Sequence, residues 1–192
     1  MLTKLRRYSK KLIRPIVNAI IKCRISANTL TLMGLAITLA YLYTTYNKLY
    51  VLSALIMLIV GFIDVLDGEV ARITNTAKPS GAYLDSVVDR IEDGIFILGF
   101  LYLNVNPALV SVLILLSLMT SYCRARSESL GVPMEGIGII ERGERVLLLT
   151  IAMGIAELNV KFTEYVLIVL LILSAVTLLQ RVSYGFKNLR SM

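Results

Sequence analysis

Histidine is absent from this chain of 192 residues, and cysteine occurs only twice. Without histidine, a general base has to be a carboxylate or a rarer group. Cys23 and Cys123 have neither a disulfide framework nor the spacing of a metal site around them. We therefore expect two free thiols and no histidine-based catalysis.

Charge is missing from several long stretches, such as residues 25–47, 49–63 and 94–123. Hydrophobic residues make up 57% of the chain, and the mean hydropathy is +0.76. A helix needs about 20 mostly apolar residues to cross a bilayer. The composition excludes an ordinary soluble protein and predicts an all-α integral membrane protein.

The apolar stretches predict six transmembrane helices. Proline and glycine at 78–81 predict a turn, after which a third helix starts near Ser80. "NVNP" at 104–107 divides the long apolar stretch into the end of one span and the start of another. The remaining expected spans contain residues 25–47, 49–63, 146–156 and 165–180.

The first 24 residues carry eight positive charges among apolar residues. No clean apolar centre with a small-residue cleavage site follows, so we expect no signal peptide. The mixture predicts an amphipathic helix in the headgroup layer, which anionic lipids would attract. A topology anchor without a role in chemistry is the alternative. We expect two parts, a juxtamembrane helix at 1–24 and a six-helix domain at 25–192.

Positive charges are distributed unequally across the six expected spans. Only Lys48 and Lys161 fall on one side, and the other 18 lysines and arginines fall on the side of the N-terminus. The positive-inside rule then predicts that the N-terminus and the four aspartates are on the cytoplasmic side. We expect the protein in the plasma membrane. Topology accounts for most of the net charge of +7, so we infer no nucleic-acid binding.

Four aspartates occur in "DVLDGEVARITNTAKPSGAYLDSVVD", residues 64–89. Asp64 and Asp67 are three apart and Asp85 and Asp89 are four apart, so each pair lies on one helical face. A short turn between the two helices lets all four carboxylates converge in a cavity open to the cytoplasm. Their repulsion calls for cations, and hard divalent ions such as Mg²⁺ prefer oxygen ligands. The sequence predicts two such ions.

Small and basic residues accompany the aspartates. Gly68 and Gly81 lack side chains, which lets a ligand approach the backbone, although helix packing is an alternative. Arg72 is placed to meet a phosphate. Pairing of the aspartates with Arg72 and Arg90 is the simpler alternative. Metal, glycine and arginine together favour a pyrophosphate ligand.

The pattern Asp-x2-Asp-Gly-x2-Ala-Arg-x8-Gly-x3-Asp-x3-Asp, from Asp64 to Asp89, resembles the signature of the CDP-alcohol phosphatidyltransferase family. All eight fixed positions match. "SAN" at 26–28 is similar to the family's Ser/Thr-Pro-Asn start of the first span, with Ala27 in place of proline. The resemblance covers most of the chain, and the six spans agree with it.

The resemblance implies an enzyme that transfers a phosphatidyl-type group from a CDP-linked lipid to an alcohol hydroxyl and releases CMP. It implies two Mg²⁺ or Mn²⁺ ions, with Asp89 as the general base, and a homodimer in the membrane. The implied metal ligands are Asp64, Asp67, Asp85 and Asp89, the last two sharing the second ion. The implied CDP-binding residues are Asn28, Asp67, Gly68, Arg72, Gly81 and Asp85.

Five arginines gather at the expected inner ends of the last three spans: Arg124, Arg126, Arg142, Arg145 and Arg181. Arginine binds phosphate through a planar fork of donors, so the set predicts a phosphorylated acceptor. Inner-side charge and pairing with nearby glutamates are the alternative. "RARSE", "ERGER" and the last arginine resemble the phosphatidylinositol phosphate synthase branch and its archaeal, ether-lipid counterpart. That resemblance implies inositol-1-phosphate as the acceptor and leaves diacylglycerol or archaeol open for the donor.

Three other functions remain open. Glycerol-3-phosphate is also anionic, which would make the chain a phosphatidylglycerophosphate-type synthase. A cation transporter with an intramembrane acidic site is an alternative of another class, but no second aspartate cluster or internal symmetry accompanies it. The four intact aspartates argue against a third possibility, a catalytically inactive lipid-binding relative.

Overall fold

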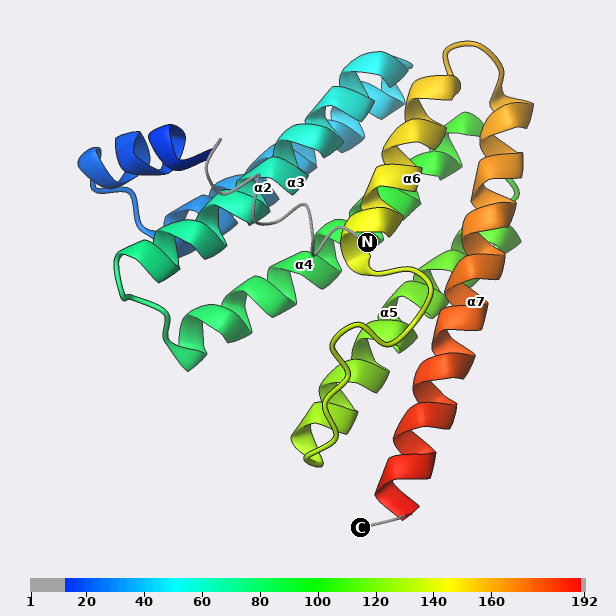
Figure 1. Ribbon diagram of the computed structural model, residues 1–192. Helices are drawn as coiled ribbons and strands as arrows, with labels where there is room; N and C mark the ends of the chain where they lie inside the picture. Colours follow the sequence, from blue (N-terminus) through cyan, green and yellow to red (C-terminus); the bar gives the residue numbers. More distant parts are fainter. Residues whose placement is uncertain (1–12, 191–192) are drawn as a thin grey trace.

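The computed structural model describes residues 13–190, which form helices and connecting loops without strands. The all-α prediction is confirmed, and Cys23 and Cys123 are free as expected. Each of the six expected spans contributes a helix (Figure 1). After a helix at Ile13–Lys22 come α2 (Ala27–Tyr46), α3 (Tyr50–Ile73), α4 (Pro79–Gly99), the 3₁₀ helix η1 (Phe100–Leu103), α5 (Pro107–Ser129), α6 (Arg142–Ile155) and α7 (Val160–Arg190).

Three of the described helices, α3, α5 and α7, are long and apolar enough to cross a membrane. The helix Ile13–Lys22 and α2 pass the same test only as a pair bent by 106°. The described chain therefore has three candidate spans, or four with the bent pair. Acidic residues on α4 and the 14-residue length of α6 set these helices apart. The protein is a membrane protein, and the count of six spans stays a prediction.

Only the second half of the expected amphipathic helix can be compared, because residues 1–12 lie outside the described residues. In that half, Ile13 and Val17 are buried against Leu30 of α2 and Leu66 of α3. Ile13 and Val17 are four positions apart, so their side chains form one apolar face of the helix. That face packs on protein, and a location in the headgroup layer stays a prediction.

Two helix starts explain features of the sequence. Ser26 caps α2 by accepting a hydrogen bond from the backbone N–H three residues on. Ala27 is then the first helical residue, where proline is also favoured, so alanine preserves the helix start. The predicted turn at 78–81 is wrong in position, because residues 74–78 form the connection. Pro79 opens α4, since its fixed φ and missing N–H suit that position.

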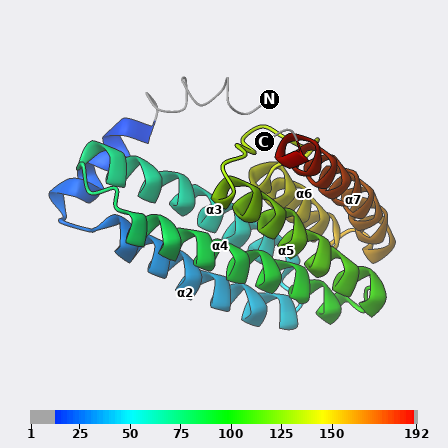
Figure 2. The ribbon, with the colours of Figure 1, turned by 90° about the horizontal axis from the view of Figure 1, so that it is seen from below.

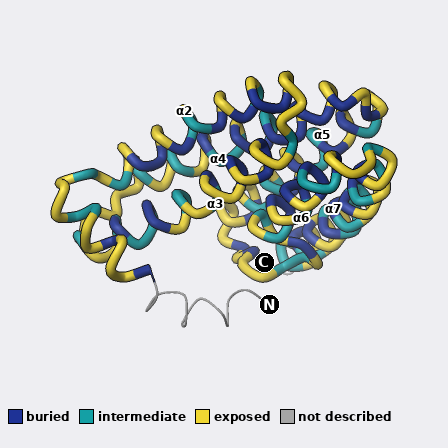
Figure 3. Tube along the Cα trace, turned by 90° about the horizontal axis from the view of Figure 1, so that it is seen from above, coloured by how far each residue is buried: buried dark blue, intermediate teal, exposed yellow. Residues whose placement is uncertain are grey.

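The helices form two groups that meet along α3–α6 and α4–α5 (Figure 2). In the first group α2 packs against both α3 and α4, and in the second α7 packs against α5 and α6. Buried positions lie where helices face one another, and the outer faces are exposed (Figure 3). Soluble monomers rarely expose so much contiguous apolar surface, which fits contact with lipid. Exposed apolar residues include Leu52, Leu55 and Ile59 of α3, Leu115 and Leu118 of α5, and Val169 and Ile172 of α7.

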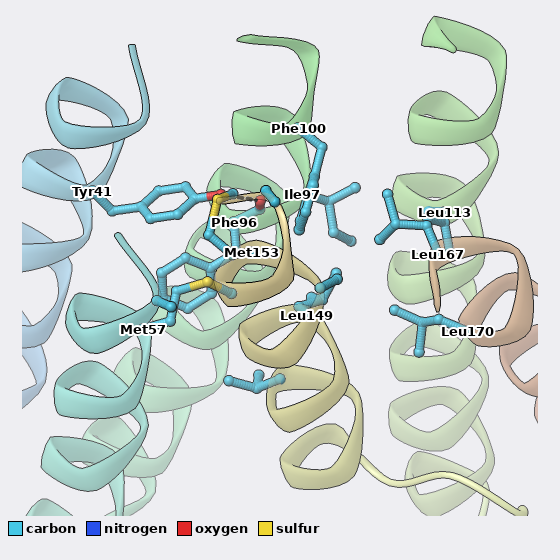
Figure 4. Packing of buried hydrophobic residues seen from close by; sticks show 14 of the residues in the cluster. Tyr41, Met57, Phe96, Ile97, Phe100, Leu113, Leu149, Met153, Leu167 and Leu170 are labelled. Carbon is cyan, nitrogen blue, oxygen red and sulfur yellow. Dashed lines mark hydrogen bonds between the residues drawn. The ribbon is translucent and has the colours of Figure 1, made fainter. Parts of the chain in front are cut away.

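The apolar core joins all six helices α2 to α7 (Figure 4). On α2 the hydroxyl of Tyr41 donates a hydrogen bond to the carbonyl of Phe96 at 2.7 Å, and the two rings meet edge to face. A Cβ at Gly99 would overlap the Tyr41 hydroxyl, so glycine is needed for this approach. The core therefore fixes α2 against the C-terminal end of α4, whereas Asp85 and Asp89 lie nearer the beginning of α4.

Candidate functional site

A cavity of about 570 Å³ lies between the beginning of α2, the end of α3 and the beginning of α4. Three different helices supply its walls, so the fold brings together residues that are distant in sequence. Every residue implied to bind CDP lines this cavity: Asn28, Asp67, Gly68, Arg72, Gly81 and Asp85.

The two signature glycines make room for polar side chains of this cavity. A Cβ at Gly81 would lie 3.2 Å from Asn28 Oδ1, and a Cβ at Gly68 would lie 3.1 Å from Arg72 Nη2. Both distances are tighter than ordinary van der Waals contact. Gly81 thus allows α2 to approach α4 closely, and Gly68 allows the Arg72 side chain to fold back along its own helix, α3.

Asp67 is fixed by a residue that the sequence did not single out. Thr31 of α2 donates a hydrogen bond from Oγ1 to Asp67 Oδ2 at 2.6 Å, in the interior. Both residues also line the cavity. Thr31 follows Asn28 by three positions, the spacing of one helical face, and this signal was available in the sequence.

Arg72 does not pair with the aspartates. Its Nε donates to the Gly68 carbonyl, and its Nη1 lies 3.2 Å from Glu69 Oε1. The side chain remains 45% exposed at the cavity. The alternative of simple charge pairing holds for Arg90, which lies 3.3 Å from Asp89.

The carboxylates of Asp64, Asp89 and Glu92 form an acidic cluster, with oxygens within 4.8 Å of one another. Asp67 lies close enough to Asp64 and Asp85 for their charges to repel its own, so the four predicted aspartates form one acidic region. Glu92 is fully buried and was not predicted. Its spacing from Asp89 continues the same face of α4.

The donor set of this region fits a divalent cation. All side-chain ligands are carboxylate oxygens, which Mg²⁺ and Mn²⁺ prefer. Glu92 Oε1 is buried and has no hydrogen-bond partner among residues 13–190, and the buried Asp89 Oδ1 faces a guanidinium. Buried carboxylates at such short separations need positive charge between them.

In this structure Arg142 supplies that charge from the first turn of α6. Its Nη1 donates to Asp64 and lies 2.8 Å from Asp89 Oδ1. Its Nη2 donates to Glu92 at 3.1 Å and its Nε to Asp93 at 3.2 Å. A single guanidinium thus faces four carboxylates, which leaves an excess of negative charge.

Two further predicted arginines meet at Thr120 of α5. Arg145 donates from Nη2 to Asp93 at 2.6 Å and from Nη1 to the Thr120 hydroxyl at 3.3 Å. Arg181 of α7 donates to the carbonyls of Thr120 and Ile137, at 2.8 and 2.9 Å. These bonds hold both guanidiniums inside the helix bundle.

The arginines of α5 lie further out. Arg124 pairs with Glu128 at 2.9 Å, as the simpler alternative expected, and both side chains are 41% exposed. Its charge still repels that of Arg181, as does the charge of Arg145. Arg126 is exposed and two positions from Arg124, so it faces another side of α5. The structure brings the predicted acceptor set together in part, without Arg126.

A second cavity, of about 300 Å³, lies beside the acidic cluster between α3, α4 and α6. Asp64 and Arg142 are its charged lining residues. The other lining residues are mostly apolar: Met57, Leu58, Val60, Gly61, Val65, Phe96, Gly143, Val146, Leu147 and Thr150. An apolar space therefore adjoins the charged site.

A sequence model of the CDP-alcohol phosphatidyltransferase family matches residues 24–184. The chain belongs to this family. It is 35% identical to the archaetidylinositol phosphate synthase of Pyrococcus horikoshii, a match that covers 98% of both chains. It is 32% identical to the phosphatidylinositol phosphate synthase of Streptomyces avermitilis, over 92% of this chain and 79% of that one.

Solved structures share the fold of this CDP-alcohol phosphatidyltransferase. The phosphatidylinositol phosphate synthase of Mycobacterium tuberculosis with CDP-DAG bound has a TM-score of 0.82 and 23% identity, covering 92% of this chain and 94% of that one. The same enzyme in complex with manganese and citrate has a TM-score of 0.80 and 24% identity, covering 90% and 88%. Six signature residues line the larger cavity, and the other two, Asp64 and Asp89, belong to the acidic cluster.

Proposed function

We propose that this CDP-alcohol phosphatidyltransferase transfers a phosphatidyl-type phosphate group from a CDP-linked lipid to a hydroxyl of inositol-1-phosphate and releases CMP. The observation that carries the proposal is the lining of one cavity by the complete implied CDP set, beside an acidic cluster that Arg142 joins. Relatives named archaetidylinositol phosphate synthase and phosphatidylinositol phosphate synthase support the acceptor. The lipid is a diacylglycerol or an archaeol.

The larger cavity receives the CDP group of the donor. Asn28, Gly68 and Gly81 shape its walls, and the exposed guanidinium of Arg72 is available to the diphosphate. Asp67 and Asp85 line the same space and face the diphosphate with oxygen ligands for metal. The apolar cavity at α3 and α6 suits a hydrocarbon chain of the lipid.

Two divalent cations, Mg²⁺ or Mn²⁺, are assigned to Asp64, Asp67, Asp85 and Asp89. When bound, such ions neutralise diphosphate charge and stabilise the CMP leaving group. Asp64 and Asp89 then no longer depend on Arg142 for charge balance. The guanidinium of Arg142 becomes free to turn toward an acceptor phosphate.

Asp89 acts as the general base on the acceptor hydroxyl. Its buried Oδ1 lies 2.8 Å from Arg142 Nη1, so it can accept a proton from the acceptor hydroxyl once that guanidinium turns away. As the proton passes to Asp89, the hydroxyl oxygen forms a bond to the lipid-bearing phosphorus. The bond from that phosphorus to the oxygen of CMP breaks, and CMP leaves with that oxygen.

The acceptor phosphate is assigned to the five arginines. Arg142, Arg145 and Arg181 are held close by Asp93 and Thr120, and Arg124 adds a fourth positive charge nearby. Like charges at this proximity repel unless an anion lies between them. Arg126 also belongs to the predicted set, and because it faces another side of α5, its side chain would have to turn to reach the phosphate.

The membrane arrangement is part of the proposal. It has six spans within a domain at 25–192, an amphipathic helix at 1–24 on the membrane surface, and a homodimer in the plasma membrane. The positive charges, with only Lys48 and Lys161 on the other side, support a cytoplasmic N-terminus and active site.

A parallel acceptor assay tests the function. Purified protein receives CDP-diacylglycerol or CDP-archaeol, Mg²⁺ or Mn²⁺, and either inositol-1-phosphate, glycerol-3-phosphate, inositol or serine, and CMP release is measured. We expect inositol-1-phosphate to give a kcat/KM at least about tenfold above the others, the equivalent of one charge-assisted hydrogen bond. Faster use of glycerol-3-phosphate would replace the acceptor, and no metal-dependent CMP release with any acceptor would contradict the enzyme.

A further inference from the structure

We propose that Asp93 is a positioning residue that holds Arg142 and Arg145 ready for the acceptor phosphate. The inference rests on the proposed function and deepens its acceptor site. Asp93 follows the signature by four positions, and it was in none of the predicted sets of site residues. It is 1% exposed on α4, where an isolated carboxylate would be strongly unfavourable.

Each oxygen of Asp93 binds a different arginine. Oδ1 accepts the Nε hydrogen of Arg142 at 3.2 Å, and Oδ2 accepts an Nη2 hydrogen of Arg145 at 2.6 Å. Ser117 of α5 adds a long contact to Oδ2 at 3.4 Å. Among the carboxylates of residues 13–190, Asp93 is the one that pairs with both arginines. The carboxylate therefore ties the first turn of α6 to α4.

The choice of nitrogen atoms leaves donors for a ligand. Asp93 binds Arg142 through Nε and Glu92 binds it through Nη2, so Nη1 becomes available once Asp64 and Asp89 are neutralised by another cation. Arg145 uses Nη1 and Nη2 on protein, and its buried Nε has no hydrogen-bond partner in the described chain. A buried guanidinium donor without a partner points to an anion that completes the site.

Asp93 also reduces the repulsion between Arg142 and Arg145. Arg142 and Arg145 are three positions apart, so their charges repel on one helical face. The carboxylate between them reduces the net charge of the trio to one positive charge. Without it, the two guanidiniums would move apart or attract other acids, such as Glu92, which contacts Arg142 alone.

Asp93 therefore differs from the signature aspartates in a way that can be measured. A change at Asp93 disturbs both arginines, whereas the signature aspartates are assigned to metal and donor. Loss of Asp93 should affect binding of the acceptor and leave binding of the CDP-lipid nearly unchanged. A residue that merely stabilises the fold would affect both substrates together.

The experiment compares Asp93→Asn, which keeps the shape and removes the charge, with Asp93→Glu, which keeps the charge. Glu157→Gln, at an exposed position beyond α6, is the matched control. KM is measured separately for CDP-lipid and inositol-1-phosphate, with thermal melting in detergent as the check of folding. For Asp93→Asn we expect the acceptor KM to rise about tenfold or more, with the donor KM within about twofold.

Asp93→Glu should give an acceptor KM between those of the wild type and Asp93→Asn, and Glu157→Gln should match the wild type. In an Arg145→Lys background, Asp93→Asn should add less than its full effect, because it acts through that arginine. An unchanged acceptor KM, equal rises for both substrates, or full additivity with Arg145→Lys would overturn the inference.

If Asp93→Asn does not fold, Asp93→Glu decides, because its displaced carboxylate should still raise the acceptor KM alone. Equal acceptor and donor effects in that variant would overturn the inference. The assay of the wild type distinguishes failure of this inference from failure of the proposed function. Use of inositol-1-phosphate by the wild type with no acceptor effect at Asp93 removes the inference alone, whereas failure of all phosphorylated acceptors removes the proposed function as well.

Discussion

Arg142 donates a hydrogen bond from Nη1 to Asp64, a residue 78 positions earlier in the chain. The bond joins the first turn of α6 to the signature helix α3, and the same nitrogen lies 2.8 Å from Asp89. One arginine thus contacts two carboxylates that the signature assigns to metal. The proposed acceptor site and the proposed metal site therefore share Arg142, which couples their charges.

This coupling predicts that Arg142 competes with divalent cations. Arg142→Gln removes a positive charge from between Asp64 and Asp89, so the variant should bind Mn²⁺ several-fold more tightly than the wild type, as Coulomb attraction requires. The Kd is measured by electron paramagnetic resonance in detergent, without substrates. Lys161→Gln, at an exposed position in the first turn of α7, removes one charge elsewhere and serves as the control. Weaker Mn²⁺ binding in Arg142→Gln would contradict the competition.

Gly81→Ala should weaken donor binding. The new Cβ would lie 3.2 Å from Asn28 Oδ1 and displace that side chain in the larger cavity. We expect the CDP-lipid KM to rise about three- to tenfold, as a strain of about 1 kcal/mol implies, with the acceptor KM unchanged. Gly94→Ala is the matched control on the same helix, because its Cβ would meet nothing within 4 Å. Equal behaviour of the two variants would contradict this role of Gly81.

Thr31→Val removes the hydroxyl that donates to the buried carboxylate of Asp67 at 2.6 Å. Loss of a hydrogen bond to a charged group costs about 1.5–3 kcal/mol, so kcat/KM for CDP-lipid should fall about tenfold or more. Thr38→Val is the control, since the Thr38 hydroxyl donates to the Gly34 carbonyl of its own helix. If both valine variants lose the same activity, Thr31 acts through helix packing and does not orient Asp67.

Asp89→Asn should abolish turnover while CDP-lipid still binds. A carboxamide cannot take the proton of the acceptor hydroxyl, and loss of a general base lowers kcat by about 10²–10⁴. Turnover is followed by CMP release, and binding is followed by calorimetry with CDP-lipid. Lost binding with residual turnover would contradict the assignment of Asp89 as base. Glu135→Gln, in an exposed loop, controls for the loss of one negative charge.

Residues of the site that share one helical face could be predicted from their spacing in the sequence. Asp64 and Asp67, or Asp85 and Asp89, share a face by local geometry alone, and the same rule extended along α4 would have reached Glu92 and Asp93. It would also have reached Thr31 from Asn28. These residues lie on helices whose periodicity is set by the backbone.

Contacts between distant helices could not be predicted in this way. The position of Arg142 among four carboxylates depends on the packing of α6 against α3. Thr120 joins Arg145 and Arg181 because α5 and α6 both pack against α7. Arg126 seemed equivalent to its neighbours in sequence, but the phase of α5 turns it outward. Topology mapping tests whether α4 and α6 cross the membrane, since charge and length distinguish them from the other helices.

The central claim is that α3 and α4 together hold divalent ions against the diphosphate of CDP. A crystal grown with Mn²⁺ and CDP, measured at the manganese absorption edge, tests it most directly. The account predicts two anomalous peaks, each in contact with the diphosphate and with carboxylates from the set Asp64, Asp67, Asp85 and Asp89. Manganese found elsewhere, or CDP bound with these aspartates turned away from it, would contradict the account.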